Sequence, residues 1–271
     1  GFDWRSLIKN NLLDDCMDEW EYYSHIVNVA MMLKSEALWS LFGDCDAEEF
    51  VFAALEYLDK KHGTAVGHFN GDENLSGTSP IQGAELCSIV ELMYSYEILF
   101  SITGNIKFLD RLELLAYNSL PAAVSPDMWT HQYDQMINQV ASFPMSKQPF
   151  RTNNNEAHLF GLEPHFGCCT ANFGQGFPKL ALSTFFRAET GIASCVLLPS
   201  AVETVMDGVH VQCRLSTEYP FRGSLKYTVK TDSPVKFSLF IRIPSFAKSA
   251  KIDGKDVKCG EFAEISKCWD G

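Results

Sequence analysis

The sequence lacks the patterns that mark nucleic-acid and membrane proteins. No run of lysine and arginine occurs, and 34 acidic against 22 basic residues give a net charge of −12. A surface of this sign provides no electrostatic attraction for the phosphates of nucleic acids. We find no apolar stretch of the roughly 18 residues that a membrane span requires. We therefore expect neither a nucleic acid nor a membrane as a partner.

Several familiar catalytic motifs are also missing. There is no glycine-rich phosphate loop, no Gly-x-Ser-x-Gly elbow for a nucleophilic serine, and no His-Glu-x-x-His helix. The chain begins with glycine instead of methionine, and its last residues do not resemble a terminal tail. We therefore expect a fragment of a longer protein.

The residues that are present predict a helical part followed by a β-rich part. Apolar residues at helical spacing occur in four segments: 25–42, 46–61, 84–103 and 106–118. Asp46 and Glu49 resemble a capping box at the start of the second of these. Four β-rich segments, separated by turn residues, come later: 195–205, 209–215, 224–231 and 235–244. The prediction is a mainly α plus β fold, with a helical domain over 1–187 (a bundle, solenoid or α/α barrel) and a β-sandwich over 188–271.

Nine cysteines are spread irregularly along the chain: 16, 45, 87, 168, 169, 195, 213, 259 and 268. Their number is odd, and a chain of this size does not need disulfides to stabilise its core. Free cysteines are commonly buried, so we expect most of them to be reduced and buried. Reduced cysteines favour a reducing compartment, and the expected location is the cytoplasm.

Cys168 and Cys169 are adjacent, and Glu85 and Cys87 precede them at the start of a predicted helix. Three thiolates and one carboxylate make a complete tetrahedral shell for zinc. Residues i and i+2 point to different sides of a regular helix, so Glu85 and Cys87 converge only at an irregular helix entry. On the pattern alone, buried structural cysteines are favoured over a metal site, because the spacing matches no standard zinc finger. A disulfide between the adjacent cysteines is a third, strained alternative.

A polar, glycine-rich loop over 67–83 leads directly to Glu85. At 17 residues it is longer than most loops in compact domains, and such loops are often functional. Carboxylates in loops are usually solvated, but Glu73 lies close enough along the chain to share a site with Glu85. A carboxyl group placed there is suited to general acid catalysis.

Three aromatic residues are candidates for contacts with a ligand. His25 lies near the start of a predicted helix, where a single histidine is more often satisfied by packing. His131 and Tyr133 flank Gln132 in a stretch with little periodicity, and this cluster is suited to binding a sugar or another polyol. A packed loop is the alternative interpretation for that cluster.

Five segments taken together resemble one enzyme family in their order and spacing: GHFNGDENLSGTSPIQGAELC, SPDMWTHQYDQMINQV, LFGLEPHFGCCTANFGQGFPK, TEYPFRG and FIRIPSFA. They are similar to glycoside hydrolase family 127 and its relatives, typified by β-L-arabinofuranosidases, over nearly the whole chain. The resemblance implies the later part of an (α/α)6 catalytic barrel followed by most of one β-sandwich domain.

The resemblance also implies the site residues. It assigns the zinc ligands to four positions: Glu85, Cys87, Cys168 and Cys169. The nucleophile is then Cys168, and the acid/base is Glu73, with Asp72 as the alternative. The resemblance predicts a zinc-dependent retaining glycoside hydrolase whose cysteine thiolate attacks a furanosidic sugar, a β-L-arabinofuranoside. The partner would be an arabinose-containing glycan, held by His25, His131 and Tyr133.

The chain departs from the family pattern at two places. Gly71-Asp72-Glu73 stands where the arabinofuranosidases carry a His-Gly-Glu-like stretch, and Thr170-Ala171-Asn172 replaces Pro-Pro-Asn after the cysteine pair. These differences indicate a divergent branch. A zinc-stabilised glycan-binding or structural module without turnover is therefore the alternative prediction.

Overall fold

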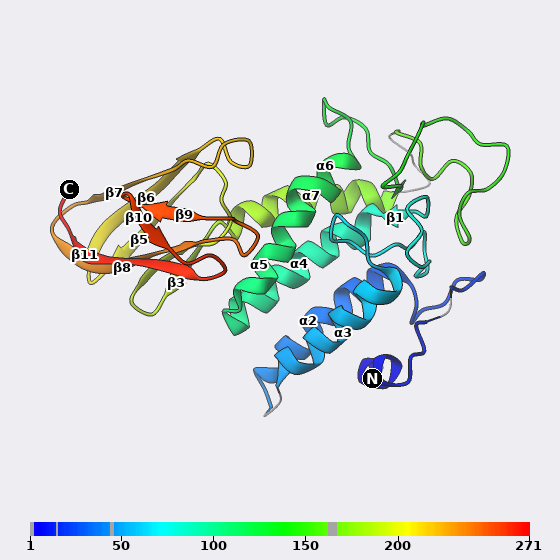
Figure 1. Cartoon of the computed structure of the whole chain (residues 1–271), viewed down its shortest axis with the longest axis horizontal. Helices are drawn as coiled ribbons and strands as arrows, with labels where there is room; N and C mark the ends of the chain where they lie inside the picture. The colour runs from blue at the N-terminus through cyan, green and yellow to red at the C-terminus, as the bar shows by residue number, and fades with distance from the viewer. Residues whose placement is uncertain (1–2, 15, 44–45, 162–166) are drawn as a thin grey trace. The chain divides into compact units, whose positions relative to one another are not determined.

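The computed structural model describes residues 3–14, 16–43, 46–161 and 167–271, and it divides into two compact units (Figure 1). The first unit comprises Gly1–Gly104 with Arg111–Phe177, and the second comprises Asn105–Asp110 with Pro178–Gly271. The first is helical and the second is built mostly of strands, which confirms the mixed fold class. The chain leaves the helical unit after Phe177. The predicted domain limit between residues 187 and 188 stays a prediction.

The helices follow the apolar periodicity closely in the first part of the chain. They are α1 (Trp4–Lys9), α2 (Ile26–Ser40), α3 (Ala47–His62), α4 (Leu86–Thr103), α5 (Ile106–Leu114), a π-helical turn η1 (Leu115–Ser119), α6 (Leu120–Ala122) and α7 (Gly167–Leu182). The side chain of Asp46 accepts a hydrogen bond from the Glu49 amide at 3.1 Å, which confirms the predicted cap of α3. Gly104, in the left-handed region at φ 70°, ends α4.

Helix α7, which carries the cysteine pair, is the longest helix that the sequence pattern missed, and the short α1 and α6 were not predicted either. It contains several glycines and Pro178, all of which have poor helix propensity. Tertiary packing provides the reason for one of them. A Cβ on Gly176 would lie 2.8 Å from Cδ2 of Leu120 and 3.2 Å from Cγ2 of Val90. The glycine therefore permits the close approach of α7 to α4 and α6.

Helix α4 is the most apolar element of the helical unit. Its 18 residues have a mean hydropathy of 1.3, so it is long and apolar enough to cross a membrane, and the sequence-based statement to the contrary is wrong. In the structure 67% of this helix is buried inside the protein. It packs against α2, where Ser95 donates to the Ala30 carbonyl at 2.7 Å. These contacts are those of a core helix.

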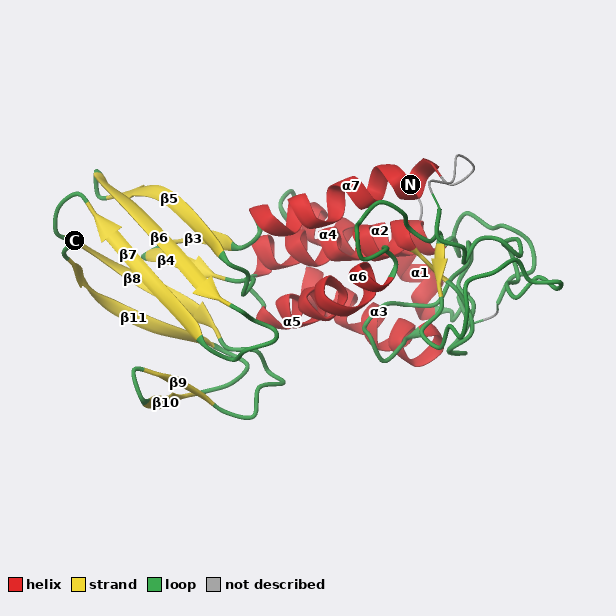
Figure 2. Cartoon of the chain, turned by 90° about the horizontal axis from the view of Figure 1, so that it is seen from above, coloured by secondary structure: helices red, strands yellow, loops and turns green. Residues whose placement is uncertain are grey.

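The second unit is a β-sandwich of two sheets (Figure 2). Its strands are β3 (Phe185–Ala188), β4 (Gly191–Ser194), β5 (Ser200–Met206), β6 (Val209–Thr217), β7 (Leu225–Thr231), β8 (Val235–Arg242), β9 (Ala250–Ile252), β10 (Lys255–Val257) and β11 (Phe262–Trp269). One sheet has the order β11-β8-β4-β3 and the other β5-β6-β7, and β9 pairs with β10. Buried residues from both sheets, such as Val211, Leu239 and Ile241, form one core.

Strand β8 alternates as its sequence predicts, except that Ser238 and Arg242 on the polar face are also buried. Val235, Phe237, Leu239 and Ile241 are buried. Arg242, which the alternation places on the polar face, is fully buried as well. Its guanidinium donates to Oδ1 of Asp110 at 2.6 Å, within the same unit. A buried arginine is tolerated there because a carboxylate neutralises it.

None of the eight cysteines that the structure describes is in a disulfide, and Cys45 lies outside the described residues. Four of them are buried: Cys87, Cys169, Cys195 and Cys213. The expectation of reduced cysteines is therefore met, but burial holds only for these four. The adjacent cysteines form no disulfide, and their sulfurs lie 4.0 Å apart.

His68 in the helical core makes the stability dependent on pH. Burial lowers the pKa of His68 to about 4, from 6.5 for an exposed histidine. Between pH 6.5 and pH 4, His68 is protonated in the unfolded chain but stays neutral in the folded chain. Protonation therefore favours the unfolded chain, and the free energy of unfolding should fall as the pH drops from 6.5 to 4. The total loss attributable to His68 is about 3 kcal/mol. Urea unfolding over this pH range measures it. The His68→Gln variant should lose this part of the dependence, and identical pH profiles for the two proteins would contradict the assignment.

Candidate metal centre and active site

A two-residue strand pair shapes the entry to helix α4. Strand β1 (Ala84–Glu85) pairs antiparallel with β2 (Asp134–Gln135), and the Leu86 amide donates to the Tyr133 carbonyl at 2.8 Å. Glu85 has the extended angles φ −62° and ψ 130°, so it precedes the helix, whereas Cys87 lies in the first turn. The irregular helix entry that the sequence required for convergence is confirmed. The same pairing brings the 133–135 segment beside Glu85.

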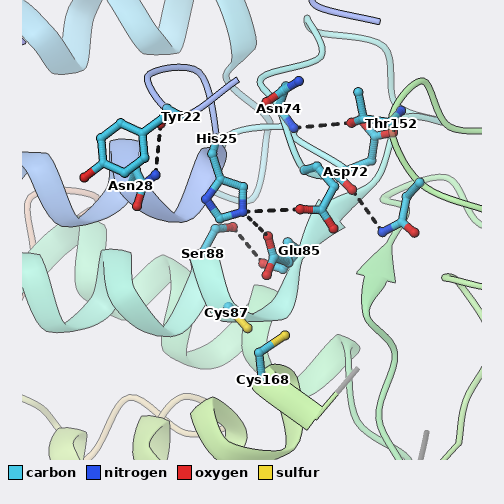
Figure 3. Close-up of polar contacts among 12 residues, drawn as sticks. Tyr22, His25, Asn28, Asp72, Asn74, Glu85, Cys87, Ser88, Thr152 and Cys168 are labelled. Carbon is cyan, nitrogen blue, oxygen red and sulfur yellow. Dashed lines mark hydrogen bonds and ion pairs between the residues drawn. The ribbon is translucent and has the colours of Figure 1, made fainter. Parts of the chain in front are cut away.

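Four side chains from this entry and from α7 converge: Glu85, Cys87, Cys168 and Cys169. Their donor atoms all lie within 4.8 Å of one another. The Cys87 and Cys169 sulfurs are 3.3 Å apart, and Cys168 faces Cys87 from the first turn of α7 (Figure 3). Cys87 and Cys169 are buried, whereas Cys168 is exposed. The structure thus brings together every predicted metal ligand.

The geometry of these donors fits a bound metal ion. Zinc–sulfur bonds of about 2.3 Å at a tetrahedral angle place ligand sulfurs roughly 3.8 Å apart. The sulfur–sulfur distances of 3.3 and 4.0 Å lie on either side of this value. Among the described residues, the buried Oε2 of Glu85 has no hydrogen-bond partner, and Nε2 of His25 lies 3.6 Å from it as an ion-pair partner. A buried group of thiols and one carboxylate can therefore hold a metal here.

Among the three thiols, Cys168 is the one that ionises most readily. The neighbouring sulfurs of Cys169 and Cys87 lower the pKa of Cys168 to about 3. The same coupling raises the pKa of Cys169, and the Cys168 sulfur is the main cause of the raised pKa of Cys87. The direction of these shifts favours Cys168 as the first of the three thiols to lose its proton. An exposed thiolate is the form of cysteine that acts as a nucleophile.

A histidine and two carboxylates form a second group that includes Glu85. Nε2 of His25 lies 3.3 Å from Oε2 of Glu73 and 3.6 Å from Oε2 of Glu85 (Figure 3). Burial alone would lower the pKa of His25, but the two carboxylates raise it to about 9. The imidazole is therefore protonated at neutral pH. Its charge lies between the predicted acid/base and the predicted metal ligand.

Glu73 is held from its other side by Tyr133. The Tyr133 hydroxyl donates a hydrogen bond to Oε1 of Glu73. Burial, followed by the nearby Glu85 and Glu73 carboxylates, raises the pKa of Tyr133, so the phenol stays protonated and remains a donor. The Glu73 side chain is 23% exposed. Its carboxylate is thus oriented by two neighbours and still open to solvent on one side.

Asp72, the alternative acid/base, is placed differently from Glu73. It is fully buried, and its Oδ2 accepts the Thr152 amide at 2.7 Å. Burial raises the pKa of Asp72. Asn153 donates at 3.0 Å to both the Asp72 carbonyl and Oδ2 of Asp134. This geometry gives Asp72 the role of a fixed support of the loop that carries Glu73.

Asn153 and Asp134 tie the loop to β2, and the sequence pattern indicated no role for either. The pKa of Asp134 is raised well above its usual range, by burial first and then by Asp72. The only sequence signal was the run of three asparagines over 153–155, a composition typical of turns. Only the tertiary structure shows that this turn packs behind the loop.

His131 is the predicted residue that the structure keeps apart from the His25 and Glu73 group. It is buried, and its Nε2 lies 2.9 Å from Oγ1 of Thr170, the residue that follows the cysteine pair. Its ring also lies 6.4 Å from Phe173. His131 therefore packs against the start of α7, and its contact with a sugar stays a prediction.

Two models of one protein family match the chain in succession. The β-L-arabinofuranosidase GH127 catalytic domain matches residues 59–182, and the GH127 middle domain matches residues 191–271. The chain belongs to glycoside hydrolase family 127. The four converging donors and Glu73 all lie within the segment that matches the family's catalytic domain. No curated protein sequence matches this family 127 chain.

Solved structures with the same fold include two further members of family 127. Ara127N-Se, a GH127 β-L-arabinofuranosidase from Geobacillus stearothermophilus T6, superposes with a TM-score of 0.76 at 19% identity, over 91% of this chain. The GH127 β-arabinofuranosidase BT3674 superposes with a TM-score of 0.70 at 18% identity, also over 91% of this chain. A third structure, described as a glycoside hydrolase, superposes with a TM-score of 0.69 at 17% identity, over 97% of this chain. This chain spans 40%, 41% and 50% of their respective lengths.

Proposed function

We propose that the protein is a zinc-dependent retaining glycoside hydrolase that acts on β-L-arabinofuranosides through the thiolate of Cys168. The observation that carries the proposal is the pair of overlapping groups that share Glu85. One contains three thiols and the other contains His25 and Glu73, and the donor atoms within each lie within 4.8 Å of one another. A nucleophile and an acid/base are thus both next to Glu85. Retaining glycosidases require two such groups close together.

The donor set favours zinc over other metals. Thiolate ligands select soft or borderline metals, and zinc takes four nitrogen, sulfur or carboxylate ligands in a tetrahedron. The ligands would be Glu85, Cys87, Cys168 and Cys169. Zinc bound to these residues would keep the coordinated thiols deprotonated at neutral pH.

The chain's own residues would carry out two displacements. The Cys168 thiolate attacks the anomeric carbon while Glu73, in its protonated form, gives its proton to the departing oxygen, and a thioglycosyl enzyme forms. Glu73, now a carboxylate, takes a proton from water as that water attacks the same carbon, and Cys168 leaves as thiolate. Two inversions retain the configuration of the sugar. Tyr133 and His25 hold Glu73 in place through both steps.

The proposed sugar follows from the family and from its solved members. Two of the similar structures are named as arabinofuranosidases, and the matching family models carry the name β-L-arabinofuranosidase. His25 and Tyr133 border Glu73 and are placed to contact sugar hydroxyls, and His131 keeps its predicted role in this proposal. The cytoplasmic location expected from the free cysteines is likewise a proposal.

One observation favours the alternative of a module without turnover. All four ligands come from the protein, and zinc sites closed in this way are usually structural, since catalytic zinc keeps an open position. In that case the metal would stabilise the contact between α7 and the start of α4 and no glycoside would be cleaved.

Metal analysis and product stereochemistry together test the proposal. The protein at its full natural length, purified under reducing conditions, should contain about one equivalent of zinc. It should also release β-L-arabinose as the first product from an aryl β-L-arabinofuranoside, as followed by NMR. Less than about half an equivalent of zinc contradicts the metal site. Zinc without cleavage of any furanoside or pyranoside supports the module.

A further inference from the structure

Trp20 is a large apolar side chain that lies exposed beside the proposed catalytic groups. In this chain Trp20 is 54% exposed. Its ring centroid lies 5.7 Å from that of His25, with the planes tilted by 49°. His25 in turn lies 3.3 Å from the Glu73 carboxylate. The indole is therefore separated from the proposed acid/base by a single side chain.

The backbone that carries Trp20 is fixed by the residue that follows Glu73. The buried Asn74 donates from Nδ2 to the Glu19 carbonyl at 2.6 Å, and its Oδ1 accepts the Glu21 amide at 3.1 Å. Both peptide groups that flank Trp20 are thus held by one side chain. Asn74 is itself anchored, because its backbone amide donates to Oγ1 of Thr152 at 3.4 Å (Figure 3).

The chain downstream of Trp20 pairs with the same loop. The Ile26 amide donates to the Glu73 carbonyl at 2.7 Å, and the Leu75 amide donates to the Ser24 carbonyl at 2.9 Å. The Trp20 segment and the Glu73 loop therefore behave as one piece of structure. An exposed aromatic ring on such a rigid support binds a ligand at little cost in conformational entropy.

The chemistry of glycoside cleavage determines which part of the substrate lies near this ring. A general acid must be within hydrogen-bond distance of the oxygen that it protonates, so the leaving group lies next to Glu73. Sugars present an apolar face of C–H groups, and an indole offers a broad apolar surface of matching size. The ring beside His25 is thus placed to contact the leaving sugar.

We propose that Trp20 is the platform of a leaving-group subsite, on which the second sugar ring of an oligosaccharide stacks while Glu73 protonates the linking oxygen. This inference rests on the proposed function and deepens it, since it names an oligosaccharide as the substrate class. Binding energy from a ring remote from the reacting carbon would then contribute to orienting the linkage.

Two substrates with the same glycone separate this subsite from the catalytic groups. The probes are a β-L-arabinofuranosyl disaccharide and β-L-arabinofuranosyl fluoride, whose leaving group is too small to reach an indole. In the full-length protein, Trp20→Ala should lower the ratio of kcat/KM for the disaccharide to kcat/KM for the fluoride about tenfold or more. Trp20→Tyr should recover part of the loss. An unchanged ratio overturns the subsite.

A matched control and a binding measurement complete the test. Trp39 is 66% exposed and lies near the other end of α2, about 20 Å from His25 along the helix, so Trp39→Ala should leave the ratio unchanged. In a Glu73→Gln background, the disaccharide should quench tryptophan fluorescence, and Trp20→Ala but not Trp39→Ala should remove the quenching. Quenching that survives Trp20→Ala overturns the subsite. If neither substrate is cleaved by the unmodified enzyme, the proposed function fails, and the fluorescence titration still decides whether Trp20 binds a sugar.

Discussion

Replacing Cys168 with serine should abolish glycoside cleavage, with kcat/KM for an aryl β-L-arabinofuranoside reduced on the order of 10⁴-fold or more. The sulfur of Cys168 is exposed, and its neighbours lower the pKa of this thiol to about 3, so the attacking thiolate is present at neutral pH. A serine hydroxyl has no such tendency to ionise. The substitution leaves the size of the side chain nearly unchanged, so it removes the thiolate as nucleophile and as proposed metal ligand with little effect on packing.

The control is a second exposed cysteine outside the site. Cys268→Ser changes a thiol of similar exposure in β11, and we expect full activity and full metal content from it. Metal content and the circular dichroism spectrum of Cys168→Ser show whether a loss of activity reflects lost zinc or lost folding. If a folded, metal-containing Cys168→Ser enzyme keeps a tenth or so of the activity, the cysteine is not the nucleophile.

Glu73→Gln should have the second largest effect, and its size should depend on the leaving group. General acid–base catalysis contributes about 10²- to 10⁴-fold, and the full factor applies to a sugar leaving group, which cannot depart unprotonated. An aryl leaving group of low pKa needs no acid in the first step, so only the second step, which needs a base, is slowed. Azide needs no base, and it should restore turnover of such a substrate to Glu73→Gln and yield the β-glycosyl azide.

Asp72→Asn distinguishes the two acidic residues of the loop. Asp72 is fully buried and accepts the Thr152 amide, so its replacement should lower the stability of the folded protein and leave the leaving-group dependence as in the unmodified enzyme. Both variants are compared by thermal unfolding and by kcat/KM for the two leaving groups. Azide rescue of Asp72→Asn instead of Glu73→Gln would reverse the assignment.

The helical part shows which elements apolar periodicity can predict and which it cannot. Apolar spacing predicts α2, α3 and α4 because each buries one or more faces in a common core. Apolar spacing does not predict α7, because this helix contains glycines and a proline. The packing of Gly176 against Leu120 explains one of these glycines, and it is seen only in the folded chain. The burial of Arg242 cannot be predicted from local spacing either, because its partner Asp110 lies 132 positions earlier in the chain. Long-range pairing of this kind leaves no local pattern.

For the candidate site too, the sequence indicates which residues could take part, and the folded structure shows which of them meet. Residue types and their order were enough to nominate Glu73, Glu85, Cys87, Cys168 and Cys169, because thiols and carboxylates are what a metal and a glycosidic bond require. The sequence alone could not decide between a metal site and inert buried thiols. The convergence of the four donor atoms within 4.8 Å makes a metal site geometrically possible, since folding brings the start of α4 to the start of α7.

The sequence by itself determined the mixed helical and β architecture, the acidic surface and the identity of the chemically capable side chains, all of which follow from composition and periodicity. Only the tertiary structure decided which of these side chains meet. It separated His131 from Glu73 by packing it against Thr170, buried Asp72 against Thr152, and joined Asn74 to the segment that carries Trp20. The physical reason is that these contacts join residues more than 30 positions apart, and such contacts are formed by packing and hydrogen bonding in the folded chain and not by local propensity.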